Sequence, residues 1–125
     1  MTARNPKLLV LVVDDEESIR AVITEILTDE GFDVATAFDG EEALLSCRAL
    51  CPDLILLDLN LPGMGGAEFL LHFRAAVSTV TPVVVVSAMV DADRTAHQMH
   101  ADDFVRKPFV ITELADTVRR HTAAA

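Results

Sequence analysis

Three acidic side chains follow runs of apolar residues, where carboxylates are costly to place. Asp14 and Asp15 close the apolar run 8–13, and Asp58 closes the run 54–57. Consecutive apolar residues are typical of strands buried on both faces of a parallel sheet, and ligands bind such sheets outside the carboxyl ends of the strands. If the two strands are neighbours, the three carboxylates converge on one pocket and repel one another. A divalent cation is the simplest relief of that repulsion.

Two more polar residues follow predicted strands. Ser87 comes after four consecutive valines at 83–86, and Lys107 comes after the segment 103–106. Three aspartates, a serine and a lysine suit phosphoryl transfer, because they supply oxygen ligands for Mg2+, a carboxylate nucleophile and donors for the phosphoryl oxygens. Taken singly, each residue also has a plainer interpretation, as a helix cap, a turn residue or a solvated charge.

The elements that would position these residues alternate along the chain. Apolar runs predict strands at residues 8–13, 34–38, 54–59, 83–86 and 103–106. Apolar residues at helical spacing predict helices at 18–30, 39–51, around 69–73, at 91–100 and around 111–118. The segment 91–100 has only a thin apolar stripe, so this helix is expected to be short and marginal.

Five strands alternating with five helices predict an α/β fold, a flavodoxin-like doubly wound (βα)5 sandwich with a five-stranded parallel sheet of order 2-1-3-4-5. In this order the first and third strands are adjacent, which brings Asp14 and Asp15 next to Asp58. At 125 residues the chain is expected to form a single domain, 1–125, with frayed tails at 1–6 and 122–125.

Composition excludes several classes of protein. A content of 51% hydrophobic residues excludes disorder, and a formal net charge of -10 argues against direct binding to nucleic acid or to anionic membrane surfaces. No apolar run approaches the ~20 residues needed to cross a bilayer, so no membrane insertion is expected. The run 8–13 is also too short for a signal peptide, and the protein is therefore expected to be cytoplasmic.

The cysteines and histidines form no metal or redox motif. Cys47 and Cys51 lack the C-x-x-C spacing and a nearby histidine, and are interpreted as buried or half-buried packing residues. The histidines have no ligand spacing and are interpreted as surface residues: His72, His97, His100 and His121.

Four segments of the chain carry a family resemblance: VVDDE at 12–16, DLNLPG at 58–63, VSA at 86–88 and DFVRKPF at 103–109. Together, in this order and at strand ends, they resemble the receiver domain of two-component response regulators, of the stand-alone single-domain type. The resemblance covers essentially the whole chain. It implies a protein that is not an enzyme, beyond catalysing its own phosphorylation and dephosphorylation.

The resemblance implies specific chemistry at the site. Asp58 would be the phosphoacceptor and would receive a phosphoryl group from a histidine kinase or a histidine phosphotransfer protein. Asp15 would bind Mg2+ directly and Asp14 through water, with Asp58 and the backbone carbonyl of Asn60 completing the ligands from the protein. Lys107 would hold a phosphoryl oxygen as a compact point charge.

The resemblance also implies a switch. The Ser87 hydroxyl would follow the phosphoryl group and draw in the loop after strand 83–86, and Phe104 would pack inward as that loop moves. Phe104 stands where the family more commonly has Tyr, and the Lys107–Pro108 peptide would be cis.

An output surface formed by helix 91–100, strand 103–106 and the last helix would bind an unknown downstream protein and allow dimerisation, again by the resemblance. Two residues depart from the family's pattern near this surface. His100 stands where the family usually has Gly, and Val110 where a capping Asp or Ser is common. The shape of the output surface is therefore expected to depart from that pattern.

Two alternatives remain open. A protein-interaction module would keep the fold without being phosphorylated, and a small enzyme would use a similar sheet for other chemistry. A flavin carrier needs a Ser/Thr- and Gly-rich phosphate loop where this chain has the acidic run 14–17. A haloacid-dehalogenase-type phosphatase needs Asp-x-Asp, and the P-loop motif is absent from the sequence. We therefore expect no turnover of an external substrate.

Overall fold

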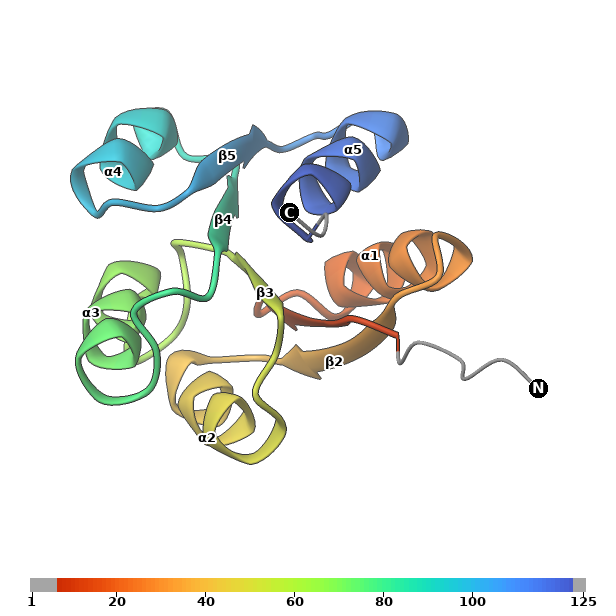
Figure 1. Ribbon diagram of the computed structural model, residues 1–125. Helices are drawn as coiled ribbons and strands as arrows, with labels where there is room; N and C mark the ends of the chain where they lie inside the picture. The colour runs from red at the N-terminus through yellow and green to blue at the C-terminus, as the bar shows by residue number, and fades with distance from the viewer. Residues whose placement is uncertain (1–6, 123–125) are drawn as a thin grey trace.

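Strands and helices alternate along the computed structural model, which describes residues 7–122 (Figure 1). The strands are β1 (Leu9–Val13), β2 (Asp33–Ala37), β3 (Leu54–Leu57), β4 (Val83–Ser87) and β5 (Asp103–Arg106). The helices are α1 (Glu17–Asp29), α2 (Gly40–Leu50), α3 (Gly66–Ala76), α4 (Ala92–Gln98) and α5 (Ile111–Thr122). Within these described residues, no helix has the length and apolar character required to cross a membrane.

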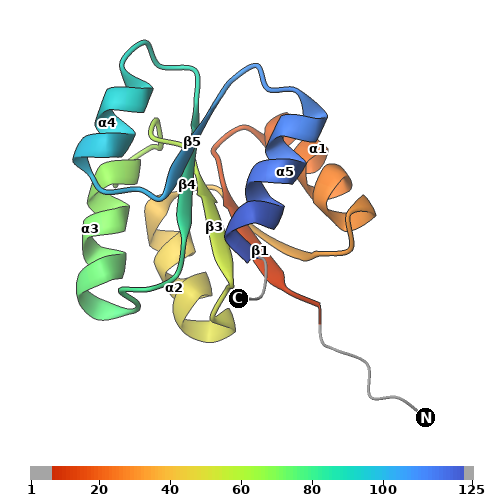
Figure 2. The same ribbon diagram turned by 45° about the horizontal axis from the view of Figure 1, so that its top comes forward.

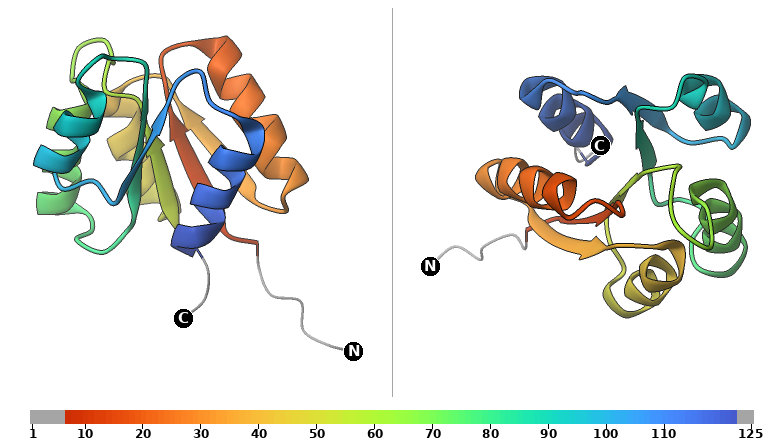
Figure 3. Two further views of the ribbon diagram at one scale, coloured as in Figure 1. Left: turned by 90° about the horizontal axis from the view of Figure 1, so that it is seen from above. Right: turned by 180° about the vertical axis from the view of Figure 1, so that it is seen from behind.

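The sheet is parallel throughout, with the strand order β2-β1-β3-β4-β5. α1 and α5 cover one face, and α2, α3 and α4 cover the other (Figures 1 and 2). The left view of Figure 3 shows that the strands run in one direction, so their carboxyl ends share one edge of the sheet. The predicted flavodoxin-like fold and its strand order are confirmed.

Burial on both faces explains the continuous apolar runs. Along β3, Leu54 and Leu56 pack with residues of α1 and α5, whereas Ile55 and Leu57 pack with residues of α2 and α3. All of these leucine and isoleucine side chains are at most 1% exposed. Because successive strand residues point to opposite faces, a strand covered on both sides has no position that faces solvent. Polar residues first appear where such a strand ends.

Local signals set the boundaries of α1 and α2. The Asp39 side chain caps α2 by accepting a hydrogen bond from the backbone N–H of Glu42 at 2.8 Å. The Glu42 side chain accepts one from the backbone N–H of Phe38 at 2.7 Å, in a reciprocal capping arrangement. Gly31 follows α1 with a φ of 96°, which favours glycine and ends the helix.

Four elements are shorter than predicted: β1 and α2 by a single residue at one or both ends, and β3 and α4 by two residues at their C-terminal ends. β3 ends at Leu57 rather than at residue 59, and α4 occupies only Ala92–Gln98 of the predicted segment 91–100. Only two α4 side chains, Ala92 and Ala96, are buried, so packing supports little more than two turns. At the C-terminal end, α5 includes Thr122, so the predicted tail 122–125 is wrong at its first residue. The rest of the predicted tails, 1–6 and 123–125, lies outside the described residues.

His100 has a left-handed backbone, with a φ of 59°, in the turn between α4 and β5. Gly adopts this conformation without steric cost, and His is one of the few other residues enriched there. His100 thus adopts here a backbone conformation that glycine reaches without steric cost.

The prediction for the cysteines is half wrong. Cys47 is fully buried in the core, and its burial, with a smaller effect of Cys51, raises the pKa of its thiol to about 12. Cys51 is exposed, because it follows the last residue of α2 with a left-handed backbone and lies beyond the buried face of the helix. The histidines are exposed at 72, 97 and 100, and His121 is half-buried with its Nε2 2.9 Å from Asp103 Oδ2.

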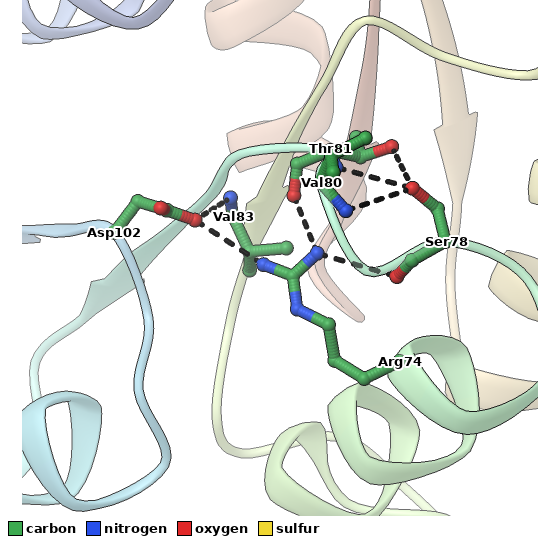
Figure 4. A network of polar contacts seen from close by, with 6 residues as sticks. All are labelled: Arg74, Ser78, Val80, Thr81, Val83 and Asp102. Atoms are coloured by element: carbon green, nitrogen blue, oxygen red, sulfur yellow. Dashed lines mark hydrogen bonds and ion pairs between the residues drawn. The ribbon is translucent and has the colours of Figure 1, made fainter.

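Arg74 joins the end of α3 to the loop before β4 and to the turn before β5 (Figure 4). Its guanidinium donates to the backbone carbonyl of Thr81 at 2.6 Å and to the Asp102 carboxylate at 3.2 Å. The same Asp102 oxygen accepts a hydrogen bond from the backbone N–H of Val83 at 2.8 Å. Because Asp102 lies between α4 and β5, this network anchors the chain that leaves α4.

The first turn of α3 lies against the backbone that carries Asp58. A Cβ on Gly66 would be 2.6 Å from the Asp58 carbonyl oxygen and 2.8 Å from the Cα of Leu59. Gly66→Ser is therefore expected to lower the free energy of unfolding by about 1–3 kcal/mol, because backbone atoms must shift. Urea denaturation measures this change.

Gly65→Ser is the matched control for that prediction. A Cβ at Gly65 would have its nearest neighbour at 3.9 Å, and Ser is a favoured N-cap, so this variant should be neutral or slightly more stable. Equal losses of stability in the two variants would contradict the close approach of α3 to Asp58.

Candidate functional site

Asp14 and Asp58, two of the three predicted carboxylates, meet at the carboxyl edge of the sheet, whereas Asp15 is grouped with Asp14 and Glu16. Asp14 follows β1 and Asp58 follows β3, and the last residues of these strands, Val13 and Leu57, are register partners. The backbone N–H of Asp58 donates to the carbonyl of Val13 at 2.9 Å. The parallel pairing of β1 with β3 therefore brings Asp14 beside Asp58, as the strand order predicted.

Lys107 reaches both buried carboxylates from the end of β5. Its Nζ lies 2.6 Å from Asp14 Oδ2 and 3.4 Å from Asp58 Oδ2. Asp14 is 2% exposed and Asp58 6% exposed, so these charges are weakly screened by solvent. When all three groups are ionised, one lysine faces two carboxylates and the cluster keeps an excess negative charge. We call Asp14, Asp15, Asp58 and Lys107 the acidic pocket.

In each buried carboxylate, one oxygen accepts a hydrogen bond within a local turn and the other faces Lys107. Asp14 Oδ1 accepts a hydrogen bond from the backbone N–H of Glu16 at 2.9 Å, and Asp58 Oδ1 accepts one from that of Asn60 at 3.2 Å. These are turns in which the side chain bonds the backbone two residues on. The turns orient both Oδ2 atoms toward the Lys107 ammonium.

The chain that leaves β1 offers oxygen ligands for a hard cation. Carboxylate oxygens of Asp14, Asp15 and Glu16 lie within 4.8 Å of one another, and only Asp14 is buried. Mg2+ is bound by oxygen atoms and usually keeps several waters, so exposed carboxylates beside a buried one fit it. Glu16 was not among the predicted ligands, although its position next to the paired aspartates is a signal that could have suggested it.

Burial raises the pKa of the Asp58 carboxyl above its ordinary value, and the Asp14 charge acts in the same direction. The Asn60 N–H and the Lys107 ammonium oppose this rise without cancelling it. For Lys107, burial alone would lower the pKa, but its hydrogen bond to Asp14 and the charges of both carboxylates raise it overall. The pocket thus holds a charged lysine beside a carboxylate whose ionised form is destabilised.

Ser87 ends β4 beside the backbone of Lys107, and Phe104 lies within β5. Ser87 is fully buried, and its Oγ accepts a hydrogen bond from the backbone N–H of Met89 at 3.1 Å. The Ser87 carbonyl accepts a hydrogen bond from the backbone N–H of Lys107 at 3.0 Å. Phe104 is half-buried and packs with the small cluster that includes Val85 and two alanines of α4. The Lys107–Pro108 peptide is cis.

Two arginines that sequence reasoning did not single out contact the chain around the pocket. Arg20 of α1 donates to the backbone carbonyl of Asp14 at 2.7 Å, and Arg106 donates to that of Met89 at 3.0 Å. Both bind backbone atoms, which no spacing or motif reveals. The only signal for Arg106 was its place inside the segment 103–109.

The family model for the response regulator receiver domain matches residues 10–119. The chain is 43% identical over 112 residues to the DNA-binding response regulator MtrA of Mycolicibacterium smegmatis. It is 42% identical over 112 residues to the transcriptional regulatory protein PrrA of Mycobacterium tuberculosis. Each match covers 88% of this chain and 48% of the relative, so the chain spans about half the length of the curated relatives it matches.

Solved structures agree with this match. A putative response regulator from Chloroflexus aurantiacus is similar with a TM-score of 0.89 and 26% identity, over 95% of this chain and 100% of that one. The chemotaxis protein CheY4 of Vibrio cholerae is similar with a TM-score of 0.85 and 32% identity, over 92% of this chain and 98% of that one. The chain belongs to the response regulator receiver domain family, which is not a family of classical enzymes.

The raised pKa of Asp58 predicts a stability difference that depends on pH. Without divalent cations, Asp58→Asn should increase the free energy of unfolding near neutral pH, because the variant no longer buries this carboxylate in ionised form. Well below the ordinary value of 3.8, both folded and unfolded wild type are protonated at this position, so the gain should vanish. The gain should grow as pH rises from 3.8 through the raised folded-state pKa and then stay constant.

Urea unfolding of wild type, Asp58→Asn and the control Asp91→Asn across this pH range tests the prediction. Asp91 is exposed and keeps its N-cap position when replaced by Asn, so the control should stay close to the wild type at each pH. A loss of stability in Asp58→Asn at neutral pH, or a gain that persists in acid, would contradict the assigned environment of Asp58.

Proposed function

We propose that this chain accepts a phosphoryl group on Asp58 from a histidine kinase or a histidine phosphotransfer protein, in a Mg2+-dependent reaction. The observation that carries the proposal is the position of Asp58, a buried carboxylate 3.4 Å from Lys107 and joined through that lysine to Asp14. A carboxylate whose ionised form is destabilised favours a reaction that neutralises it or pairs it with a cation. Membership of the receiver family supports the same reaction.

The chemical step is a displacement at phosphorus. An oxygen of Asp58 forms a bond to the phosphorus of the donor's phosphohistidine, the phosphorus–nitrogen bond breaks, and the imidazole leaves. The product is an acyl phosphate on Asp58. Lys107 would pair its ammonium with a phosphoryl oxygen, which places a positive charge where negative charge is transferred.

Mg2+ fits the oxygen donors of the pocket, and when bound it would neutralise charge on the transferring phosphoryl group. We propose Asp14, Asp15, Asp58 and the backbone carbonyl of Asn60 as the residues that hold it. Asp15 is exposed at the end of β1, so it can bind a cation without breaking the contact between Lys107 and the two buried carboxylates.

Ser87 and Phe104 would carry the signal to the output face, which we define as α4, β5 and α5. The Ser87 oxygen accepts a hydrogen bond from Met89, so its O–H remains free to donate to a phosphoryl oxygen. If this hydroxyl rotated toward Asp58, the loop that leads to α4 would move with it. Phe104 packs against α4 and would respond to that movement. The output face would then bind a downstream protein or a second copy of the chain.

The partners and location follow from this role. We propose protein partners and no direct contact with nucleic acid, because the chain has a formal net charge of -10. The regulators MtrA and PrrA are named for DNA binding and transcription, but the chain spans about half of each. The proposed location is the cytoplasm.

A protein-interaction module that is never phosphorylated is the second candidate. The contact of Lys107 with both buried carboxylates favours it, because the lysine already compensates part of their charge without any metal. Phosphorylation experiments separate the two functions.

Incubation with acetyl phosphate and Mg2+ should add one phosphoryl group to the wild type, measured by intact mass spectrometry. Asp58→Asn should remove this product entirely, because an amide is a far weaker nucleophile than a carboxylate. Asp91→Asn, which changes an exposed aspartate in the same way, should be phosphorylated like the wild type. A wild type that stays unmodified, or an Asp58→Asn variant that is still modified, would overturn the proposal.

Asp15→Asn should weaken Mg2+ binding at least about tenfold in calorimetric titration, because it removes a proposed metal ligand. Its fold should be unaffected, since the side chain is exposed. Glu17→Gln is the control, because Glu17 lies in the first turn of α1, outside the cluster of neighbouring carboxylates. Equal Mg2+ affinities in Asp15→Asn and wild type would show that Asp15 is not a ligand.

A further inference from the structure

Arg106, the last residue of β5, contacts the loop before α4, the first turn of α4 and a neighbour on its own strand. Its guanidinium donates to the backbone carbonyl of Met89 at 3.0 Å and lies 3.6 Å from the Asp93 carboxylate in the first turn of α4. The centre of the same guanidinium is 5.1 Å from the centroid of the Phe104 ring, in a cation–π arrangement. One side chain therefore links β5, α4 and the loop between β4 and α4 (residues 88–91).

Met89 is held from both sides of its peptide backbone. Its N–H donates to Ser87 Oγ, and its carbonyl accepts from Arg106. The side chains of Met89 and Val90 are 49% and 87% exposed, so apolar packing contributes little to the position of this loop. The Met89 carbonyl also accepts a hydrogen bond from the backbone N–H of Ala92 at 3.1 Å. The loop is therefore held by this backbone contact together with the side chains of Ser87 and Arg106.

The two ends of α4 are held differently. Arg74 and Asp102 anchor the chain that leaves α4 (Figure 4). Arg74 donates to the backbone carbonyl of Thr81, and Asp102 accepts from the backbone N–H of Val83. The start of α4 has no side-chain cap, and its first turn is joined to β5 through Asp93 and Arg106. Among the side-chain contacts, those of Arg106 are thus the ones that restrain the start of the helix from β5.

We infer that Arg106 is a positioning residue that holds the β4–α4 loop and Phe104 in the arrangement seen here, and so sets how readily the domain switches. The inference rests on the proposed function. Movement of the Ser87 hydroxyl toward a phosphoryl group on Asp58 releases the Met89 N–H. The loop then moves only if the Arg106 contacts to Met89 and Asp93 are exchanged, and Phe104 moves inward only by leaving the guanidinium.

Removal of the side chain should therefore favour the switched arrangement. The contacts of Arg106 with Met89, Asp93 and Phe104 exist in the present arrangement and are broken in the switched one. Their loss therefore destabilises only the present arrangement. Arg106→Lys separates charge from geometry, because an ammonium can still approach Asp93 but cannot stack its plane on Phe104.

Hydrogen exchange of the unliganded protein tests the restraint itself, without any phosphoryl chemistry. Arg106→Ala should increase amide exchange in the segment 88–93 about three- to tenfold, with an intermediate effect in Arg106→Lys. Arg94→Ala is the matched control, because Arg94 is an exposed arginine of α4 whose side chain makes no hydrogen bond or ion pair with other described residues. Unchanged exchange in Arg106→Ala would overturn the inference.

Titration with beryllofluoride at fixed, saturating Mg2+ tests the consequence for switching, with the NMR signals of Phe104 and residues 88–91 as the readout. The half-saturating concentration should fall about two- to fivefold in Arg106→Ala and stay at the wild-type value in Arg94→Ala. Mg2+ affinity alone should be equal in all variants, because Arg106 binds no residue of the acidic pocket.

The outcomes distinguish the inference from the function on which it rests. If the wild type responds to beryllofluoride and Arg106→Ala responds at the same concentration, the inference fails and the proposed function stands. If the wild type does not respond, the proposed function fails and the inference about switching falls with it.

Discussion

The contact of Lys107 with two buried carboxylates is the interaction on which the rest of the site depends. Pairing of β1 with β3 brings Asp14 and Asp58 together at low exposure, where like charges repel strongly. An ammonium 2.6 Å from one and 3.4 Å from the other lets both remain buried. Because Lys107 follows β5, the contact also ties the ends of three strands together across β4. The site thus also stabilises the carboxyl edge of the sheet.

The same edge leads directly to a short helix that buries few side chains. Ser87 is fully buried at the end of β4, between the acidic pocket and the β4–α4 loop. Beyond it lie two exposed apolar side chains and a helix of seven residues with only two buried alanines. A change of charge at Asp58 would therefore act first on an element with few stabilising contacts. Arg74 binds Asp102, four residues beyond the end of that helix, and so holds the chain that leaves it.

The fold could be predicted because its main signals are local and strong. Apolar runs bounded by Asp14 and Asp58 fixed the buried strands, and right-handed crossovers left one common strand order. What could not be predicted depends on contacts between distant residues. Arg20 and Arg106 bind backbone carbonyls, the exposure of Cys51 depends on where α2 ends, and α4 is short because little of it packs. The roles of the site residues rest on the family resemblance and on the geometry of Lys107, and they stay predictions.

Chemical trapping of the phosphorylated residue tests the central claim most directly. Borohydride reduces an aspartyl phosphate to homoserine, and peptide mapping by mass spectrometry then identifies the position that was modified. After incubation with a phosphodonor and Mg2+, we predict homoserine at position 58 and at no other aspartate. Homoserine at position 14 or 15 instead, or its absence from every peptide of a protein shown to bind Mg2+, would contradict the account.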